Sequence, residues 1–230
     1  MFQAVIFDMD GLMFDTERLA KQAWEQIGLR YGVEIGEDIL ARIRGATPEA
    51  CEAVFRDAFG PGFPFWEARA ARRNWVDSQI ECIGVPVKPG LTGLLARLKQ
   101  AEIKTSVASS SPRETIERYL HKSRLEGYFN CVVGAEQVEH SKPAPDVFLA
   151  AARLLGVSPP ACLVLEDSAN GLYAARNAGM TAICIPDIAQ PEADALGTAA
   201  AVLPSLAGVW DWIERYSIRQ AAAGAMPDQH

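Results

Sequence analysis

Two aspartates stand directly after an apolar segment near the start of the chain. Phe2 to Phe7 (FQAVIF) predicts a short buried strand, and Asp8-Met9-Asp10-Gly11 follows it at once. Side chains at positions i and i+2 of an extended chain point to the same side, so both carboxylates would face one ligand. Burying two neighbouring carboxylates is unfavourable, and a divalent cation would relieve this. Asp8 could then attack an electrophile while Asp10 moves a proton, although D-x-D alone also fits a solvated loop.

A second acidic pair, Glu166-Asp167, follows the apolar segment 162–165. Carboxylate oxygens from two strand ends suit Mg²⁺, which prefers oxygen ligands and keeps several waters. Taken alone, acids at this position also fit the first turn of a helix, where the helix dipole favours them. Together with Asp8 and Asp10, they favour a metal site.

Two further segments supply groups that could bind an anion. Ser109-Ser110-Ser111-Pro112 ends a predicted strand and opens a helix, where free N–H groups and hydroxyls can hold a phosphate. Ser111 is predicted to cap that helix in either case. Lys142 lies in a segment stiffened by two prolines, and it could neutralise a phosphate and the acidic cluster. A lone Lys in a loop is otherwise usually exposed to solvent.

The elements that must position these residues form an alternating pattern. After residue 85, short strands alternate with helices, which predicts an α/β fold with a Rossmann-like, doubly wound parallel sheet covered on both faces. Ligands of such open sheets bind at the carboxyl ends of the strands, where Asp8, Ser109 and Glu166 would meet.

The helical block between the first strand and the rest of the sheet is predicted to be an inserted subdomain of about four helices. The expected parts are a core domain of residues 1–14 and 85–217, a cap domain of residues 15–84, and a disordered tail of residues 218–230.

The composition disfavours several classes of function. The net charge is −7, from 22 Lys and Arg against 29 Asp and Glu, which disfavours nucleic-acid and anionic-membrane partners. Five scattered cysteines without a C-x-x-C pair indicate reduced thiols rather than a disulfide framework. The apolar N-terminal segment is too short for a signal peptide, and no stretch approaches the ~18 apolar residues of a membrane span. We expect a cytoplasmic monomer that acts on a small molecule.

With these motifs in order along the chain, the sequence resembles the haloacid dehalogenase-like (HAD) superfamily. Asp8-Met9-Asp10-Gly11 resembles its motif I, Ser109 its motif II, Lys142 its motif III and Glu166-Asp167 its motif IV. The surrounding segments VIFDMDGLMFDTE, SKPAPDVF and LEDSANGLYAARNAG match as well. The resemblance covers residues 1 to about 215, and the helical insertion looks like the C1-type cap of the β-phosphoglucomutase-like branch, which includes sugar phosphatases.

The resemblance implies a Mg²⁺-dependent phosphoryl-transfer site. Asp8 would be the nucleophile that forms an aspartyl-phosphate, and Asp10 the general acid/base. Mg²⁺ would be held by the Asp8 side chain, the Asp10 backbone carbonyl and Asp167, with Glu166 assisting directly or through water. The residues expected to bind the phosphoryl group are Gly11, Ser109, Ser110 and Lys142.

The cap implied by the resemblance would close over the substrate and exclude bulk water. Glu17, Arg44 and Trp24 are the candidate substrate contacts there. Their alternative interpretations are a helix-start acid, a surface charge and a core aromatic, and the core interpretation is preferred for Trp24.

Three departures from the sugar phosphomutases of this branch bear on the substrate. Their cap-helix His corresponds to Ala20, their cap-loop Lys to Arg44, and the Arg four residues later to Pro48. A Lys-Asn pair that helps to hold phosphate is replaced by Pro112-Arg113, where Arg113 would compensate in part.

A mutase must retain a bisphosphate during reorientation, so these losses favour a phosphatase of small phosphomonoesters, above all sugar phosphates. The alternative is a β-phosphoglucomutase-type sugar phosphomutase. Asp10 and the second acidic pair argue against carbon–halogen hydrolysis, and the intact motifs argue against a non-catalytic binding protein.

Overall fold

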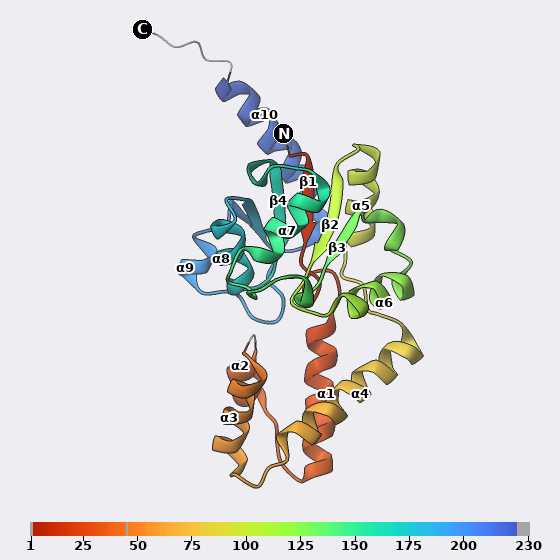
Figure 1. The fold of residues 1–230 in the computed structure, drawn as a ribbon, viewed down its shortest axis with the longest axis vertical. Coiled ribbons are helices and arrows are strands. Elements are labelled where there is room, and N and C mark those ends of the chain that lie inside the picture. Colours follow the sequence, from red (N-terminus) through yellow and green to blue (C-terminus); the bar gives the residue numbers. More distant parts are fainter. Residues whose placement is uncertain (1, 45, 225–230) are drawn as a thin grey trace. The chain divides into compact units, whose positions relative to one another are not determined.

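The computed structural model describes residues 2–44 and 46–224 of the chain. These divide into a core unit, which extends to Asp15 and resumes at Pro86, and a helical unit from Thr16 to Val85. The core unit is built on a parallel sheet of strand order β3-β2-β1-β4-β5-β6 (Figure 1). The strands are β1 (Ala4–Phe7), β2 (Lys104–Ala108), β3 (Cys131–Val133), β4 (Cys162–Glu166), β5 (Thr181–Cys184) and β6 (Ala201–Val202).

Helices cover both faces of this sheet, which confirms the predicted α/β, doubly wound fold. Ile6, Val164 and Cys184 share a core with α7 and α8 on one face, and Figure 1 shows α7 crossing in front of the strands. The intervening residues, such as Phe7 and Leu165, are equally buried, so the strands read as continuous apolar runs. The helices of the core unit are α5 (Leu91–Gln100), α6 (Arg113–Ser123), α7 (Asp146–Leu155), α8 (Ala169–Asn177), α9 (Ala193–Leu196) and α10 (Val209–Gly224), with 3-10 turns η1 (Glu126–Tyr128), η2 (Ala135–Gln137), η3 (Pro159–Ala161) and η4 (Leu206–Gly208).

The register of the sheet brings the ends of its central strands together. Phe7 lies beside Val107 of β2 and Leu165 of β4 in the parallel ladders. The residues that follow, among them Asp8 and Glu166, therefore emerge at the same carboxyl edge. This is the edge at which open α/β sheets bind ligands.

The helical unit has an aromatic core of its own. The ring of Phe55 lies 4.8 Å from that of Trp24 and 5.2 Å from that of Phe65, measured between centroids. Trp24 is thus the core aromatic that the preferred interpretation expects. The segment Thr47-Pro48-Glu49-Ala50 predicts a helix start with Thr47 as the N-cap. Thr47 Oγ1 accepts a hydrogen bond from the Ala50 N–H at 3.3 Å and caps a helix there. The helices are α1 (Thr16–Tyr31), α2 (Glu37–Ile43), α3 (Pro48–Phe59) and α4 (Phe65–Ile83).

The last helix differs from its prediction at both ends. The sequence predicts a helix over residues 205–216, whereas α10 begins at Val209, after the turn η4, and continues to Gly224. The helix thus covers the beginning of the predicted disordered tail 218–230, because the alanine-rich segment there has a high helix propensity. Residues 225–230 of that tail lie outside the described residues. Within the described ranges, no helix combines the length and apolar character needed to cross a bilayer.

Candidate active site

Asp8 stands at the carboxyl end of β1, where the chain leaves the sheet. Its backbone N–H still donates to the Leu165 carbonyl oxygen of β4 at 3.0 Å, and the residue is buried. A tight turn follows, in which the Met13 N–H donates to the Met9 carbonyl oxygen at 2.9 Å. Gly11 takes a positive φ of 85° in this turn, a conformation that glycine adopts without strain. The last rung of the sheet and this turn therefore fix Asp8 from both sides.

Lys142 is the cation that faces Asp8. Its Nζ donates to Asp8 Oδ1, to Glu166 Oε1 at 2.6 Å and to the Ala108 carbonyl oxygen at 3.2 Å. The Lys142 side chain is only 6% exposed, so these oxygens rather than water stabilise its charge. Burial lowers the pKa of Lys142, but the charges of Asp8 and Glu166 outweigh burial and raise that pKa above its usual value. The loop lysine predicted from the sequence is thus a buried, charged group beside the two acids.

Glu166 organises the loop after β4. Its side chain is 0% exposed, and its Oε2 accepts hydrogen bonds from the Asp167 and Ser168 N–H groups at 3.0 Å and from Ser168 Oγ at 2.9 Å. Ser168 Oγ accepts in turn from the Gly171 N–H at 3.1 Å and caps α8. A side chain at Gly171 would collide with the Glu166 carboxylate. Glu166 therefore holds Lys142 and the start of α8 in place.

Asp10 also has a partner that the sequence does not predict. Asp10 Oδ2 accepts a hydrogen bond from Ser111 Oγ at 2.7 Å, and the Ser111 N–H donates to Ser109 Oγ at 3.0 Å. The prediction that Ser111 caps the following helix is wrong, because its hydroxyl binds Asp10. The cap position of α6 is Pro112, which makes no side-chain cap. Ser109 is buried beside this contact, whereas Ser110 is exposed.

The acidic residues of the core unit fit a hard cation. One carboxylate oxygen from each of Asp8, Glu166 and Asp167 lies within 4.8 Å of the others. Burial raises the pKa of Asp8 to about 8, although Lys142 opposes this, and burial with the charges of Glu166 and Asp8 raises the pKa of Asp167. A bound cation would relieve both shifts, because it stabilises the ionised carboxylates. The donor set thus fits the Mg²⁺ expected from the sequence.

Two residues that the sequence interpretation misses lie at the same edge of the sheet. Lys88 Nζ donates to Asp187 Oδ1 and lies 3.8 Å from Asp15 Oδ1. Asp187 comes shortly after β5, just as Asp8 and Glu166 stand at the ends of β1 and β4. The sequence signal that could have identified Asp187 is its position, since it is an acid just beyond a predicted strand.

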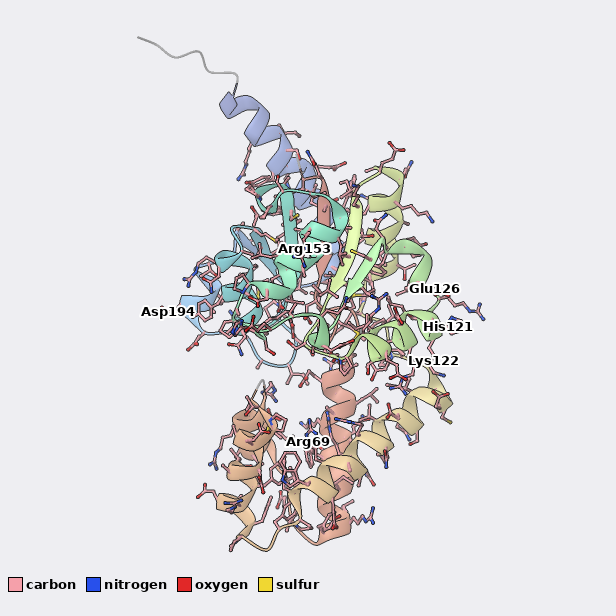
Figure 2. The ribbon with its side chains drawn as sticks, in the orientation of Figure 1. Arg69, His121, Lys122, Glu126, Arg153 and Asp194 are labelled. Carbon is pink, nitrogen blue, oxygen red and sulfur yellow. The ribbon has the colours of Figure 1, made fainter. Side chains whose placement is uncertain are left out.

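The helical unit contains a cationic hollow of about 210 Å³. Arg44 donates to Glu37 Oε1 at 2.7 Å, and the Arg72 guanidinium lies 5.8 Å from the ring centroid of Trp24. Arg69 comes from α4 and is labelled in Figure 2. The hollow brings together the three cap residues predicted from the sequence and adds further cations that the sequence interpretation misses. Its lining includes Glu17, Lys21, Trp24, Arg44, Arg69 and Arg72.

Comparison with known proteins places this geometry in a family. A model of the haloacid dehalogenase-like hydrolases matches residues 2–179. A phosphorylated carbohydrates phosphatase of Thermotoga maritima is 34% identical over 185 residues, which cover 79% of this chain and 83% of that protein. A fructose-1-phosphate phosphatase of Escherichia coli strain K12 is 32% identical over 186 residues, 79% of this chain and 95% of that protein. A solved β-phosphoglucomutase of Clostridium difficile shares the fold, with a TM-score of 0.77 and 23% identity over 96% of this chain and 100% of its own.

Proposed function

The chain belongs to the haloacid dehalogenase-like hydrolases and is a phosphatase, and we propose that it hydrolyses small phosphomonoesters through an aspartyl-phosphate on Asp8, with Mg²⁺ as cofactor. The observation that carries this proposal is the buried Asp8 carboxylate, which contacts the Lys142 ammonium and has an oxygen within 4.8 Å of an Asp167 carboxylate oxygen. Phosphoryl transfer needs mainly positioning and charge stabilisation, and this arrangement supplies both.

The first half of the reaction breaks the ester. A carboxylate oxygen of Asp8 attacks phosphorus, the bond from phosphorus to the ester oxygen breaks, and Asp10 gives its proton to the departing alcohol. Ser111 holds the Asp10 carboxyl through the 2.7 Å hydrogen bond, which restricts where that proton is delivered. Lys142 favours the ionised form of Asp8 that the attack requires.

The second half regenerates the enzyme. Asp10, now ionised, takes a proton from water while the water oxygen attacks phosphorus, and the bond between phosphorus and Asp8 breaks to release inorganic phosphate. Mg²⁺ would be held by Asp8, Asp167, the Asp10 backbone carbonyl and Glu166, and when bound it would neutralise charge on the phosphoryl oxygens. Lys142 offsets part of the same charge, and we propose that Gly11, Ser109 and Ser110 line the phosphoryl position.

Sugar phosphates are the proposed substrate class. The curated relatives named for phosphorylated carbohydrates and for fructose 1-phosphate support this. We propose that the hollow of the helical unit selects among these esters, with Glu17 and Arg44 contacting the substrate. Its lining includes more cations than carboxylates, so the choice of ester should depend on whether the sugar carries a second acidic group.

The test is phosphate release from a panel of esters, with Mg²⁺ and again with EDTA. The panel contains a neutral hexose phosphate, a phosphorylated sugar acid, a sugar bisphosphate and a nucleotide. We expect metal-dependent phosphate release from sugar phosphates and no release by Asp8→Asn. The control Asp211→Asn changes an exposed aspartate of the core unit and is expected to release phosphate normally. Release that survives EDTA or Asp8→Asn would contradict the proposal.

Three further experiments sharpen the result. Acid-quenched samples should carry phosphate on the peptide that contains Asp8. Arg69→Met should raise KM for the preferred ester, whereas Arg73→Met, on the exposed side of the same helix, should not. A β-glucose 1-phosphate assay primed with glucose 1,6-bisphosphate tests the mutase alternative. Isomerisation that outpaces phosphate release would replace the phosphatase reaction with that alternative.

A further inference from the structure

Asp187 has one carboxylate oxygen that no group among the described residues satisfies. The side chain is 4% exposed, and its Oδ1 accepts the Lys88 ammonium. Its Oδ2 is fully buried and has no hydrogen-bond partner in the described part of the chain. A buried carboxylate oxygen without a partner is unfavourable, so a group that donates to it is expected.

The position of this oxygen points to the metal site. A Cβ atom placed on Gly11 would collide with Asp167 Oδ2 and would lie 3.4 Å from Asp187 Oδ2. The two oxygens therefore flank the same point, just beyond the turn that follows Asp8. Asp187 is nevertheless absent from the group whose ligand atoms lie within 4.8 Å of one another. It stands next to the described metal-binding carboxylates without being one of them.

We propose that Asp187 is a positioning residue for Mg²⁺, whose Oδ2 accepts a hydrogen bond from the hydration shell of the ion. This inference rests on the Mg²⁺ site of the proposed function. Mg²⁺ gives up its waters reluctantly and keeps several of them in protein sites. Acceptors outside the direct ligands orient such groups, and their loss typically weakens metal binding about 10–100-fold.

Lys88 makes an additional acid tolerable at this edge of the sheet. Without Lys88, Asp187 would add another negative charge beside Asp8, Glu166 and Asp167. The paired Lys88 and Asp187 add no net charge, so the pair offers the site a hydrogen-bond acceptor rather than a longer-range attraction for cations. A purely structural ion pair would explain the burial of Oδ1, but it leaves Oδ2 unexplained.

The experiment measures Mg²⁺ binding to the metal-free protein by calorimetry at pH 8. Asp187→Asn can still accept from Lys88 through its amide oxygen, but its amide nitrogen is a donor where an acceptor is needed. We expect the Kd for Mg²⁺ to rise at least about 10-fold. The matched control Asp211→Asn, in an exposed pair with Arg97, is expected to leave the Kd unchanged.

A second variant separates this role from a structural one. Lys88→Met leaves Asp187 in place with more negative charge at the site, so we expect Mg²⁺ to bind no more weakly than in the wild type, although the metal-free protein loses stability in urea. Equal weakening in Asp187→Asn and Lys88→Met would overturn the proposal, as would a Kd in Asp187→Asn within twofold of the wild type. If the wild type itself bound no Mg²⁺, the proposed metal site would fail and this inference with it. Normal wild-type binding with an unaffected Asp187→Asn would refute this inference alone.

Discussion

Lys142→Met tests whether one buried ammonium holds the acidic cluster together in the metal-free protein. Lys142 is 6% exposed, and it contacts Asp8, which is 10% exposed, and Glu166, which is 0% exposed. Removing one partner of a buried ion pair usually costs about 3–5 kcal/mol, because the remaining charge has neither a partner nor water. The size of the stability loss depends on which of the two carboxylates can be neutralised by binding a proton.

Asp8 can do so more easily than Glu166. Burial raises the pKa of Asp8 to about 8, so at pH 7 its carboxyl is mostly protonated in the metal-free protein and stays neutral once Lys142 is gone. Glu166 keeps the three donors to Oε2 but loses the one to Oε1. We therefore expect a loss near the lower end, about 3 kcal/mol at pH 7.

The loss is expected to grow above pH 8. In the wild type Asp8 is ionised there, whereas in the variant its folded-state pKa is higher and the folded state still binds a proton that the unfolded state does not. Stability of the variant then falls by up to about 1.4 kcal/mol per pH unit while that of the wild type stays level.

Hydrogen exchange of the β4 peptide, followed by mass spectrometry in EDTA, reports the stability of the core unit separately from the helical unit. Mg²⁺ should restore part of the loss, because it neutralises carboxylates in place of Lys142. Arg97→Met is the control, since its pair with Asp211 is exposed and is expected to contribute less than about 1 kcal/mol. A change in Lys142→Met as small as in the control, with no dependence on pH, would refute the reasoning.

Three other predictions concern the metal site and the thiols. Because burial raises the pKa of Asp8 to about 8, Mg²⁺ must displace a proton from Asp8 at neutral pH. The affinity for Mg²⁺ is therefore expected to rise up to about pH 8 and then level off. Calorimetry in buffers of different ionisation enthalpy would detect the released proton. Gly11→Ala adds a methyl group against Asp167 at a φ of 85°, and is expected to weaken Mg²⁺ binding about 10-fold or more. The control Gly179→Ala changes a glycine with a similar φ of 70° and open space around it. It should lose only stability, which urea unfolding would measure. Cys82 is exposed, whereas the other four thiols are buried or half-buried and have pKa values raised by burial. A disulfide reagent should therefore label Cys82 rapidly, and Cys82→Ser should abolish the fast phase of labelling.

Local signals explain why the sequence predicts so many element boundaries. The sequence predicts helices over 37–43 and 65–83 and a strand over 104–108, and the three elements occupy those residues in the structure. Thr47 and Pro48 mark a helix start through a side-chain cap and a proline at the first helical position, both of which act within a few residues. Apolar runs ending in acids mark β1 and β4 for the same reason.

Side-chain partners far apart in the sequence were not predictable in this way. From its local sequence, Ser111 could cap the following helix. The sheet instead places it beside Asp10, and its hydroxyl donates to the Asp10 carboxylate. Lys88 and Asp187 are separated by 99 positions, and nothing near either residue indicates the other. Their contact follows from the order of the strands, which brings the loop after β5 to the edge where the chain re-enters the core unit.

The balance of charge explains why a protein of net charge −7 can act on a dianionic ester. Once their carboxyls are ionised, Asp8, Glu166 and Asp167 face the single ammonium of Lys142, so a phosphate approaching the metal-free site would meet more negative than positive charge. Lys88 does not offset this negative charge, because its ammonium is already paired with Asp187. A divalent cation reverses the balance at the place where the phosphoryl oxygens must lie. On this reasoning we expect Mg²⁺ to be needed for binding the substrate as well as for the proposed chemistry, because the carboxylates proposed to hold the ion would repel phosphate until the ion is present.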